Sequence, residues 1–405
     1  MLDIDDDSFE EQTLTPRATC QVACHFDGTW QVSGDYLLYD DLVSTWSPEV
    51  PYNHLPDLPP AQDVETKAVL KAVTEARVAV ARLDRAANLM PDPSVLINTI
   101  PLLEAQASSE IENIVTTTDA LFRSAQLGDE TTDPAVKETL RYRSALRLGF
   151  ESVAARGLTV ATAVQVCSSI TDVDMGVRAL PGTRIANPVT QQVIYSPPEG
   201  RHVIETKLGA LESFIHSSPH LDPIVRMALA HYQFEAIHPF NDGNGRTGRI
   251  LNMLLLVEAG LLQTPVLYLS RYIIDHKQDY YRLLADVTRV GAWEEWVLYM
   301  VEAVRSSAVS TLAKIDAIDG LAARFSEEAA DVTPGLRHAG FLSVLFAQPY
   351  ARIGDVMDRC EVSRPTAAGW LNDLVAAGML TDVKVGRDRL FLNTKYLELL
   401  AERGD

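Results

Sequence analysis

The chain has 405 residues, of which 47% are hydrophobic, and a formal net charge of −20. This length can bury a large core in roughly two or three domains, and the negative charge excludes non-specific binding of nucleic acid over the whole surface. No apolar run approaches the roughly 20 residues that span a bilayer, and the acidic start MLDIDDDSFEEQ is unlike a signal peptide, so we expect a cytoplasmic protein without membrane contact.

The first 63 residues are expected to contain little helix. Residues 1–45 alternate weakly and hold Asp-Gly and Ser-Gly turn signals, which favour a short β-hairpin or meander. Residues 46–63 are rich in proline and should be extended, because successive prolines fix φ and remove hydrogen-bond donors. Cys20, Cys24 and His25 have no second ligand pair of matching spacing, so two unpaired thiols are a better interpretation than a metal site.

Two helices are expected next, and the second carries a polar motif near its end. Apolar residues recur at helical spacing over residues 64–87. After a Pro-Ser start signal, a second helix is expected over residues 95–114. Within it Ser108 and Glu112 are four positions apart and therefore project from one face, and Asn113 suits the left-handed turn that ends a helix.

The middle of the chain alternates helices with one hairpin. Helices are expected over residues 132–155 and 158–170, the first with an Asp-Pro capping signal. Two short β-prone runs within residues 184–196, bracketed by Pro-Gly and Pro-Pro, predict a hairpin. Two more helices follow over residues 201–218 and 222–240, the second again starting at Asp-Pro.

Residues 337–405 differ in character from the rest. Three helical stretches precede two β-prone runs joined by Gly-Arg-Asp and a last helix, which is the pattern of a small winged helix-turn-helix domain. The residues that could contact DNA from the third helix and the wing are Ser363, Arg364, Thr366, Lys384, Arg387 and Arg389. The charges of this tail roughly cancel, so binding of DNA, binding of protein and homodimer formation all stay open.

Residues 236–258 concentrate the chemistry of the chain. An apolar run ends at His238, a loop of Asn, Asp and Gly follows, and residues 246–258 have helical spacing, so the loop lies at a helix N-terminus. The first N–H groups of a helix are unpartnered and its dipole is positive there, which favours anions. Gly243 and Gly245 have no Cβ and let backbone amides approach a phosphate closely.

Side chains around this loop suit phosphoryl-type transfer. Asn244 adds an amide donor, and Arg246 and Arg249 share one helix face. Asp242 is an oxygen ligand of the kind that Mg²⁺ accepts beside phosphates. His238, with a pKa expected near neutrality, can take the proton of an attacking hydroxyl.

Residues 238–249, HPFNDGNGRTGR, resemble the signature of the Fic family, HxFx(D/E)GNGRxxR, with every specified position present. The resemblance implies a mainly helical enzyme with a β-hairpin flap that transfers AMP from ATP to a Ser, Thr or Tyr hydroxyl of a target protein. It implies that His238 is the general base, Asp242 the Mg²⁺ ligand and Phe240 the core anchor. The residues that it implies for ATP binding are Gly243, Asn244, Gly245, Arg246, Thr247, Gly248 and Arg249.

Three other parts of the chain are similar to the family. The motif of Ser108 and Glu112 resembles its inhibitory (S/T)xxxE(G/N) motif, which implies that Glu112 pairs with Arg249 and blocks the productive seat of the γ-phosphate. Tyr281 and Tyr280 match a Tyr-Tyr pair of the adenosine pocket. The hairpin, residues 184–196, corresponds to the flap that aligns a target protein by strand addition.

The prediction is a mainly α protein with four regions: an extension, 1–45, with β structure; a helical region with the inhibitory helix, 46–125; a Fic catalytic core, 126–310; and a winged-helix domain, 337–405. The leading hypothesis is a protein adenylyltransferase restrained by Glu112 in the same chain.

Three rival hypotheses stay open. The first is removal of AMP from a target, with Glu112 positioning water. The second is the Doc-like branch, which phosphorylates its target; that branch has lysine where Gly245 stands, so the sequence argues against it. The third is a regulator that binds DNA through the winged helix.

Overall fold

The structure is a computed structural model that describes residues 22–24, 30–32, 46–90, 96, 98–128, 133–186, 190–385 and 388–402. The chain divides into two compact units, Met1–Thr45 and Trp46–Asp405. In the first unit β1 (Val22–Cys24) and β2 (Trp30–Val32) pair antiparallel, which confirms the predicted hairpin. Cys20 and His25 lie outside the described residues.

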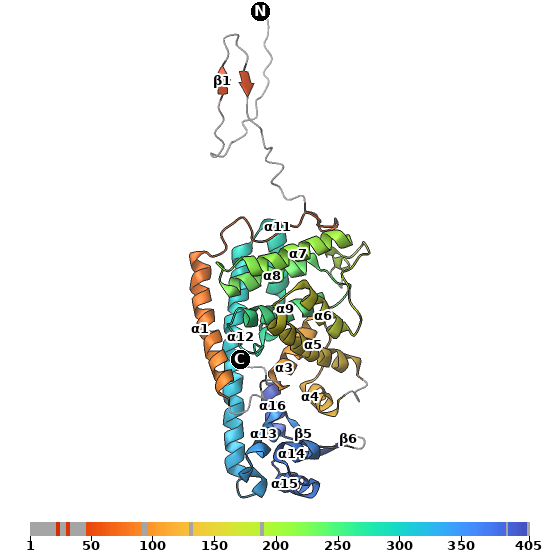
Figure 1. The fold of residues 1–405 in the computed structure, drawn as a ribbon, viewed down its shortest axis with the longest axis vertical. Coiled ribbons are helices and arrows are strands. Elements are labelled where there is room, and N and C mark those ends of the chain that lie inside the picture. Colours follow the sequence, from red (N-terminus) through yellow and green to blue (C-terminus); the bar gives the residue numbers. More distant parts are fainter. Residues whose placement is uncertain are drawn as a thin grey trace, which may run out of the picture. The chain divides into compact units, whose positions relative to one another are not determined.

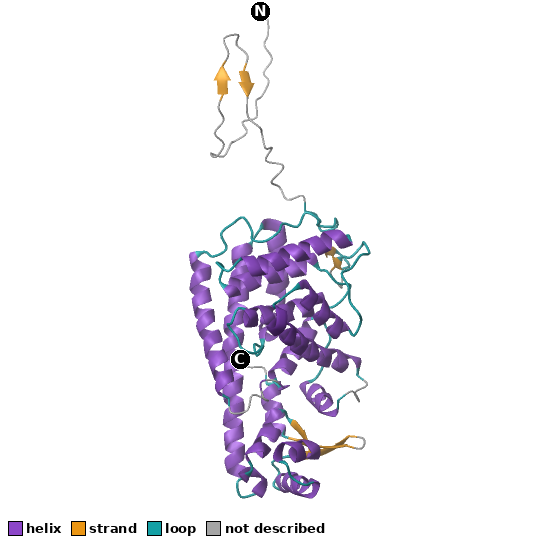
Figure 2. Ribbon diagram, in the orientation of Figure 1, coloured by secondary structure: helices purple, strands orange, loops and turns teal. Residues whose placement is uncertain are grey.

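The second unit is mainly helical (Figures 1 and 2). The elements up to its long helix are α1 (Lys67–Leu89), α3 (Ile100–Ile111), α4 (Thr118–Leu127), α5 (Pro134–Arg156), α6 (Val160–Thr171), β3 (Ile185–Ala186), β4 (Val193–Tyr195), α7 (Arg201–Ser217), α8 (Pro223–Ile237), α9 (Asn244–Glu258), α10 (Leu269–Asp275), α11 (Lys277–Val290) and α12 (Trp293–Ala329). The elements after it are η2 (Pro334–Arg337), α13 (Ala339–Ala347), β5 (Tyr350–Arg352), α14 (Ile353–Cys360), α15 (Arg364–Ala376), β6 (Thr381–Val385), β7 (Asp388–Leu392) and α16 (Thr394–Ala401).

Helix ends follow their local sequence signals. The side chains of Asp133 and Asp222 accept N–H groups from the first turns of α5 and α8, and each is followed by proline at the first helical position, as predicted. The helix α3, which carries Ser108 and precedes Glu112, ends as expected, because Asn113 adopts a φ of 64° and the chain turns out of the helix there. The helix α4 was not predicted; Thr117 caps it by accepting the N–H of Ala120.

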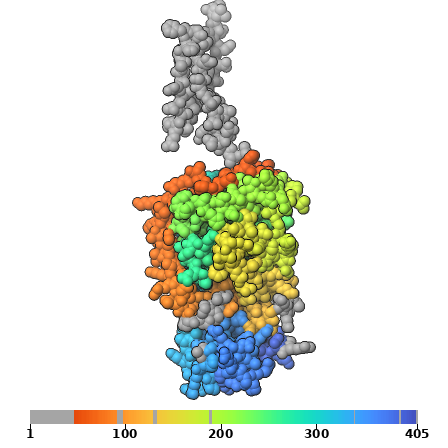
Figure 3. All heavy atoms as spheres, viewed as in Figure 1, coloured from red at the N-terminus to blue at the C-terminus, as the bar shows by residue number. Residues whose placement is uncertain are grey.

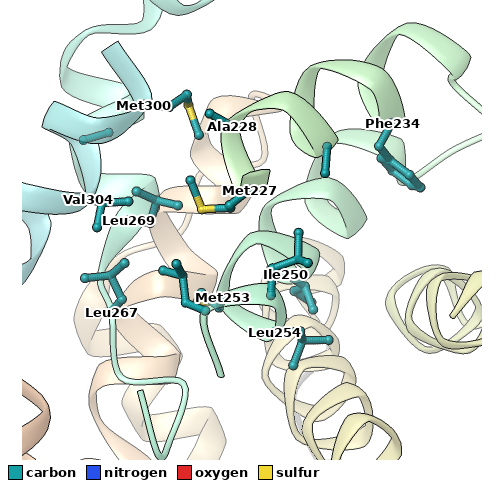
Figure 4. Close-up of a cluster of buried hydrophobic side chains, with 14 of the residues drawn as sticks. Met227, Ala228, Phe234, Ile250, Met253, Leu254, Leu267, Leu269, Met300 and Val304 are labelled. Atoms are coloured by element: carbon teal, nitrogen blue, oxygen red, sulfur yellow. The ribbon is translucent and has the colours of Figure 1, made fainter. Parts of the chain in front are cut away.

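The centre of the larger core is built by α8 and α9. Figure 4 shows Met227 and Phe234 of α8 facing Ile250 and Met253 of α9, with Met300 of α12 beside them. These five side chains are almost completely buried. Because the catalytic loop joins α8 to α9, the packing of these two helices fixes both ends of the loop.

The helix α12 has 37 residues and continues past residue 310, where the predicted catalytic core ends. Its first half packs along α1, as Figure 1 also shows. Its second half carries Ile318, Leu321 and Phe325 into a second core made mostly by residues of the C-terminal part. The packing of these apolar residues stabilises α12 over residues 311–329, for which the sequence analysis predicted no structure.

The C-terminal residues, blue in Figure 3, gather at one end of the second unit. They form helices around a three-stranded antiparallel sheet of order β5-β7-β6, so the predicted hairpin is present and β5 adds a third strand. The helix α3 contributes to both cores, with Ile100 and Ile111 in one and Leu102 and Leu103 in the other. The helix therefore packs against both cores.

The proline-rich segment before α1 is non-helical, as predicted, and crosses the base of the hairpin β3–β4. The N–H of Tyr52 donates to the carbonyl of Ser196 at 3.0 Å, and the Ser196 hydroxyl donates to the carbonyl of Pro48 at 2.7 Å. In the part of the chain that the structure describes, no helix combines the length and apolar character needed to cross a lipid bilayer.

Candidate active site

The loop between α8 and α9 is held in shape by its own side chains. Gly243 has a φ of 78°, in the left-handed region that favours glycine, and a Cβ there would lie 3.1 Å from Thr171. Phe240 is fully buried and packs against Phe234. Asn244 Oδ1 accepts the N–H of Phe240 at 2.9 Å, and its Nδ2 donates to the Phe240 carbonyl at 2.8 Å.

These bonds correct the expected role of the Asn244 side chain. Its amide is buried and binds the Phe240 backbone inside the loop, because short polar side chains bind nearby backbone groups readily, so one of its two N–H donors is already used there. The backbone N–H groups at the start of α9 remain as anion donors. The helix begins at Asn244, two residues before the predicted start, which places Gly245 within its first turn.

His238 ends α8 in a left-handed conformation, with φ of 48° and ψ of 60°. Its ring is half-buried, and Nδ1 has no partner among the described residues. Burial, followed by the positive charge of Arg178, lowers the pKa of His238 to about 4, which corrects the expectation of a value near neutrality. The imidazole is therefore neutral at pH 7 and can accept a proton.

Asp242 lies in the loop with its side chain 72% exposed, and Oδ1 accepts the N–H of Gly243 at 2.7 Å. Within the described residues, no group of three or more His, Cys, Asp or Glu side chains could hold a metal ion. A magnesium ion at Asp242 would therefore take its other ligands from phosphate oxygens and water, which is the usual manner for this ion. The exposed carboxylate fits that role.

Arg249 is held by the end of the inhibitory helix. Its side chain is 1% exposed, and Nη2 lies 2.8 Å from Glu112 Oε1. Nε donates to Ser108 Oγ at 2.8 Å, and Nη2 also donates to the Ser108 carbonyl at 2.9 Å. Although burial by itself raises it, the charge and hydrogen bond of Arg249 hold the pKa of Glu112 below its ordinary value. The ion pair expected from the sequence is present.

Gly245 lies directly under the Glu112 carboxylate. A Cβ at this position would be 2.3 Å from Glu112 Oε1, which is closer than atoms can approach, and 3.1 Å from Arg249 Nη1, which is a tight contact. Glycine is therefore required here for the ion pair to form as it does. The carboxylate covers the first turn of α9, where the unpartnered backbone amides would otherwise face an anion.

Arg246 does not share the ligand face with Arg249, contrary to the prediction. Its side chain is 3% exposed and pairs with Glu138 of α5, while Asp242 lies 3.8 Å from Nη2. Residues three apart on a helix diverge by about 60° around its axis, and here that difference directs the Arg246 side chain toward α5 and away from Arg249. Thr247 is fully buried, so its side chain does not face a ligand. Gly248 packs against α8, where an added Cβ would meet side chains of that helix.

A cavity of about 610 Å³ adjoins the Glu112 carboxylate. Its walls come from the end of α3, the hairpin β3–β4, the end of α8 and one face of α11, and they include Tyr281. Tyr280 does not line it: the side chain is 1% exposed, and its hydroxyl lies 2.8 Å from His231 Nε2. Tyr281 therefore borders the cavity, whereas Tyr280 lies in the aromatic core beside Trp296.

Three further residues of the cavity wall were not predicted. Lys277 precedes Tyr281 by one helical turn and donates to the Ile111 carbonyl at 2.6 Å. Glu235 precedes His238 by three residues; burial raises its pKa to about 7, and Oε1 has no partner among the described residues. Lys277 and Glu235 each lie one helical turn before a predicted site residue, so this spacing could have identified them from the sequence. Trp46 gave no such signal.

The hairpin β3–β4 pairs antiparallel, with Ile185 opposite Tyr195, which confirms the hairpin predicted for residues 184–196. Residues 187–189 of that stretch lie outside the described residues. The side chain of Ile194 in β4 is 45% exposed and borders the cavity. The hairpin therefore lies beside the cavity, and residues of both strands line it.

Comparison with known proteins agrees with this geometry. Residues 70–151 match the Fic/DOC family N-terminal domain, residues 168–256 match the Fic/DOC family domain, and residues 321–396 match the C-terminal domain of SoFic-like protein adenylyltransferases. The matches leave residues 257–320 outside these three domains, where α10, α11 and most of α12 lie.

Individual relatives are similar over short stretches. A protein adenylyltransferase fic-1 from Caenorhabditis briggsae is 32% identical over 110 residues, which cover 27% of this chain and 20% of that protein. The fic-1 protein of Caenorhabditis elegans is 37% identical over 82 residues, 20% of this chain and 15% of that protein. The chain thus spans about a fifth of the length of these relatives. A crystal structure of a Fic family protein from Desulfovibrio desulfuricans G20 shares the fold, with TM-score 0.51 and 21% identity over 83% of this chain and 98% of that one.

Proposed function

Because this chain belongs to the Fic/DOC family, we propose that it is a protein adenylyltransferase that moves AMP from ATP to a hydroxyl group of a target protein. The observation that carries the proposal is the junction of α8 and α9. There a neutral His238, an exposed Asp242 and the N-terminus of α9 lie on one loop, and Glu112, which covers that N-terminus, borders a cavity of about 610 Å³. Relatives that bear the name protein adenylyltransferase support the same reaction.

In the proposed reaction the target hydroxyl oxygen attacks the α-phosphorus of ATP. The bond from that phosphorus to the bridging oxygen of the β-phosphate breaks, and pyrophosphate leaves. The proton of the hydroxyl passes to the His238 imidazole, which is neutral. The amides at the start of α9 stabilise the charge that develops on the phosphate oxygens. Magnesium, bound with ATP at Asp242, would supply positive charge beside the phosphates.

The ribose and adenine fit the cavity beside Tyr281, whose ring borders a mostly apolar wall. Aromatic rings pack well against a nucleobase. The target chain would lie along the hairpin β3–β4, where strand addition would hold its Ser, Thr or Tyr residue near His238. The class of hydroxyl follows from the chemistry of attack and belongs to the proposal.

We further propose that Glu112 restrains the reaction. Its carboxylate occupies the Arg249 guanidinium at 2.8 Å and covers Gly245, which are the groups expected to hold the terminal phosphates. A carboxylate and a phosphate compete directly for one arginine, and each 1.4 kcal/mol of preference changes occupancy about tenfold. Loss of Glu112 should therefore admit ATP in the productive orientation.

The DNA-binding alternative gains no support from the C-terminal sheet. Arg389 of β7 pairs with Asp382 at 3.0 Å and lies over the Phe391 ring at 4.7 Å, so its charge is partly neutralised. Arg387 lies outside the described residues. A DNA complex would need free cations on this wing.

The proposal is tested by incubating the protein and a cell lysate with ATP labelled in its α-phosphate. Glu112→Gly should label protein at least about tenfold more strongly than the native chain, since a hydrogen bond to a charged group is worth about 1.5–3 kcal/mol. Adding His238→Ala should reduce that labelling by about 10²–10⁴. If Glu112→Gly instead removes AMP from pre-modified protein, or labels nothing, the proposal is wrong.

A further inference from the structure

Arg178 lies shortly before the hairpin β3–β4 in the sequence and joins it to the end of α8, which is about 60 residues further along the chain. Its side chain is 2% exposed. Nε donates to the His238 carbonyl at 2.7 Å, and Nη2 donates to the carbonyls of Ile237, at 3.2 Å, and Pro198. The backbone N–H of Arg178 donates to the Pro239 carbonyl at 2.9 Å.

The last carbonyls of α8 need such partners. The final turn of a helix leaves its carbonyls without intrahelical donors, and burial makes an unpartnered carbonyl costly. Tyr195 of β4 donates its hydroxyl to the Ala236 carbonyl at 2.8 Å, and Arg178 serves the next two carbonyls. Three consecutive carbonyls are therefore bound by two side chains, Tyr195 in β4 and Arg178 before β3.

These bonds also hold an unfavourable backbone. His238 has a φ of 48°, and a residue with a Cβ adopts that conformation only where surrounding contacts impose it. The donor on the carbonyl of His238 itself is the Arg178 guanidinium. A planar guanidinium fixes the direction of its donors more strongly than a flexible ammonium does.

We propose that Arg178 is a positioning residue for His238, setting the direction of the imidazole and tying it to the base of the hairpin that would hold the target. This inference rests on the proposed function for its catalytic meaning. If the hairpin and His238 move as one unit, a target strand that pairs with β4 is also aligned with the His238 imidazole. The charge of Arg178 additionally keeps the imidazole neutral, since it is the second cause, after burial, that lowers the pKa of His238.

The kinetic test uses variants in the Glu112→Gly background with ATP and one labelled target. Arg178→Met should lower kcat by about 10- to 100-fold while the KM for ATP changes less than threefold, because the residue touches no phosphate position. Arg178→Lys should recover part of kcat, since an ammonium can reach one carbonyl. The control is Arg201→Met: Arg201 donates to the Val177 carbonyl in the same segment at 3.3 Å, but its side chain is 58% exposed and pairs with Glu205 of its own helix.

A spectroscopic readout keeps the inference separate from the proposed function. The imidazole signal of His238, assigned by its loss in His238→Asn, should change position and broaden in Arg178→Met but not in Arg201→Met. Its titration midpoint, which also reflects the facing charges of Glu112 and Asp242, should rise above about 4. If Glu112→Gly transfers no AMP but the signal changes as described, the proposed function fails and the positioning role stands.

Two results would overturn the inference. One is an unchanged imidazole signal and unchanged kcat in folded Arg178→Met. The other is a loss of kcat in Arg178→Met that Arg201→Met reproduces in full. Should Arg178→Met fail to fold, as judged by circular dichroism, Arg178→Lys carries the test, and a kcat equal to that of the parent would then contradict the role.

Discussion

The Glu112 carboxylate lies 2.8 Å from the Arg249 guanidinium and, in the same place, directly over the Cα of Gly245. One side chain thus covers two groups that an ATP phosphate tail would need. Glu112 ends α3, a helix clamped between two hydrophobic cores, so its carboxylate is held by packing as well as by charge. Four predictions test this arrangement and the chemistry beside it.

Removal of the Ser108 hydroxyl should weaken the hold on Arg249. Ser108 Oγ accepts from Arg249 Nε at 2.8 Å in a buried setting, and hydrogen bonds to charged groups are worth about 1.5–3 kcal/mol. Because Glu112 stays in place, Ser108→Ala should raise protein labelling by about three- to tenfold, less than Glu112→Gly. The matched control is Ser109→Ala, since the buried Ser109 hydroxyl has no partner among the described residues. Equal labelling by both variants would contradict the prediction.

The pH dependence of Glu112→Gly should report a base of low pKa. Burial and Arg178 lower the pKa of His238 to about 4, so the ring is neutral above that value and gains its proton as pH falls through it. Glu112 raises this pKa, so its removal places the midpoint at or below about 4. The initial rate should therefore stay level from pH 7 to about pH 5, with circular dichroism as the check on folding. An acid limb centred near pH 6.5 would refute the assignment.

Alanine at position 245 should be harmful only while Glu112 is present. In the native chain its Cβ would lie 2.3 Å from Glu112 Oε1, so the ion pair must open, and the free energy of unfolding should fall by about 1–3 kcal/mol. In Glu112→Gly the clash is absent, and alanine is favoured over glycine in a helix by up to about 1 kcal/mol. Urea unfolding of the four proteins of this cycle gives the coupling. The same loss in both backgrounds would argue against the close approach.

Removal of the Asp242 carboxylate should affect catalysis without affecting the fold. Its side chain is 72% exposed and makes contacts within its own loop and with Arg246. In the Glu112→Gly background, Asp242→Ala should lower kcat by about 10²-fold or more, because the metal beside the phosphates loses its protein ligand. The thermal midpoint should stay within about 2 °C, since exposed substitutions cost little stability. Full activity of Asp242→Ala with magnesium, or activity of the parent in excess chelator, would contradict the metal role.

Parts of the fold and site were predictable because their causes are local. The Asp133 and Asp222 caps bind N–H groups two residues away, and helical spacing gave α5 through α9 to within a few residues. The loop from His238 to Arg249 and the partner of Glu112 followed from residue types and from a family resemblance. In each case the interacting groups lie close in sequence or belong to a short motif.

Other features depended on contacts that no local pattern encodes. The Arg246 guanidinium faces Glu138, 108 residues away, instead of the phosphate side, and α12 continues into a second core that its own sequence did not announce. The Asn244 amide, expected to face a ligand, closes its own loop. Which face of a helix meets which neighbour is decided by packing.

The sequence by itself therefore determined where the helix start proposed to bind phosphate lies and which residues surround it, because dihedral preferences, capping and dipoles act over a few residues. The tertiary structure decided what those residues touch. It set the low pKa of His238 through burial, gave Arg178 its three carbonyls and seated Glu112 on Gly245. These are effects of solvent exclusion and of distances between segments far apart in the chain, which exist once the cores have formed.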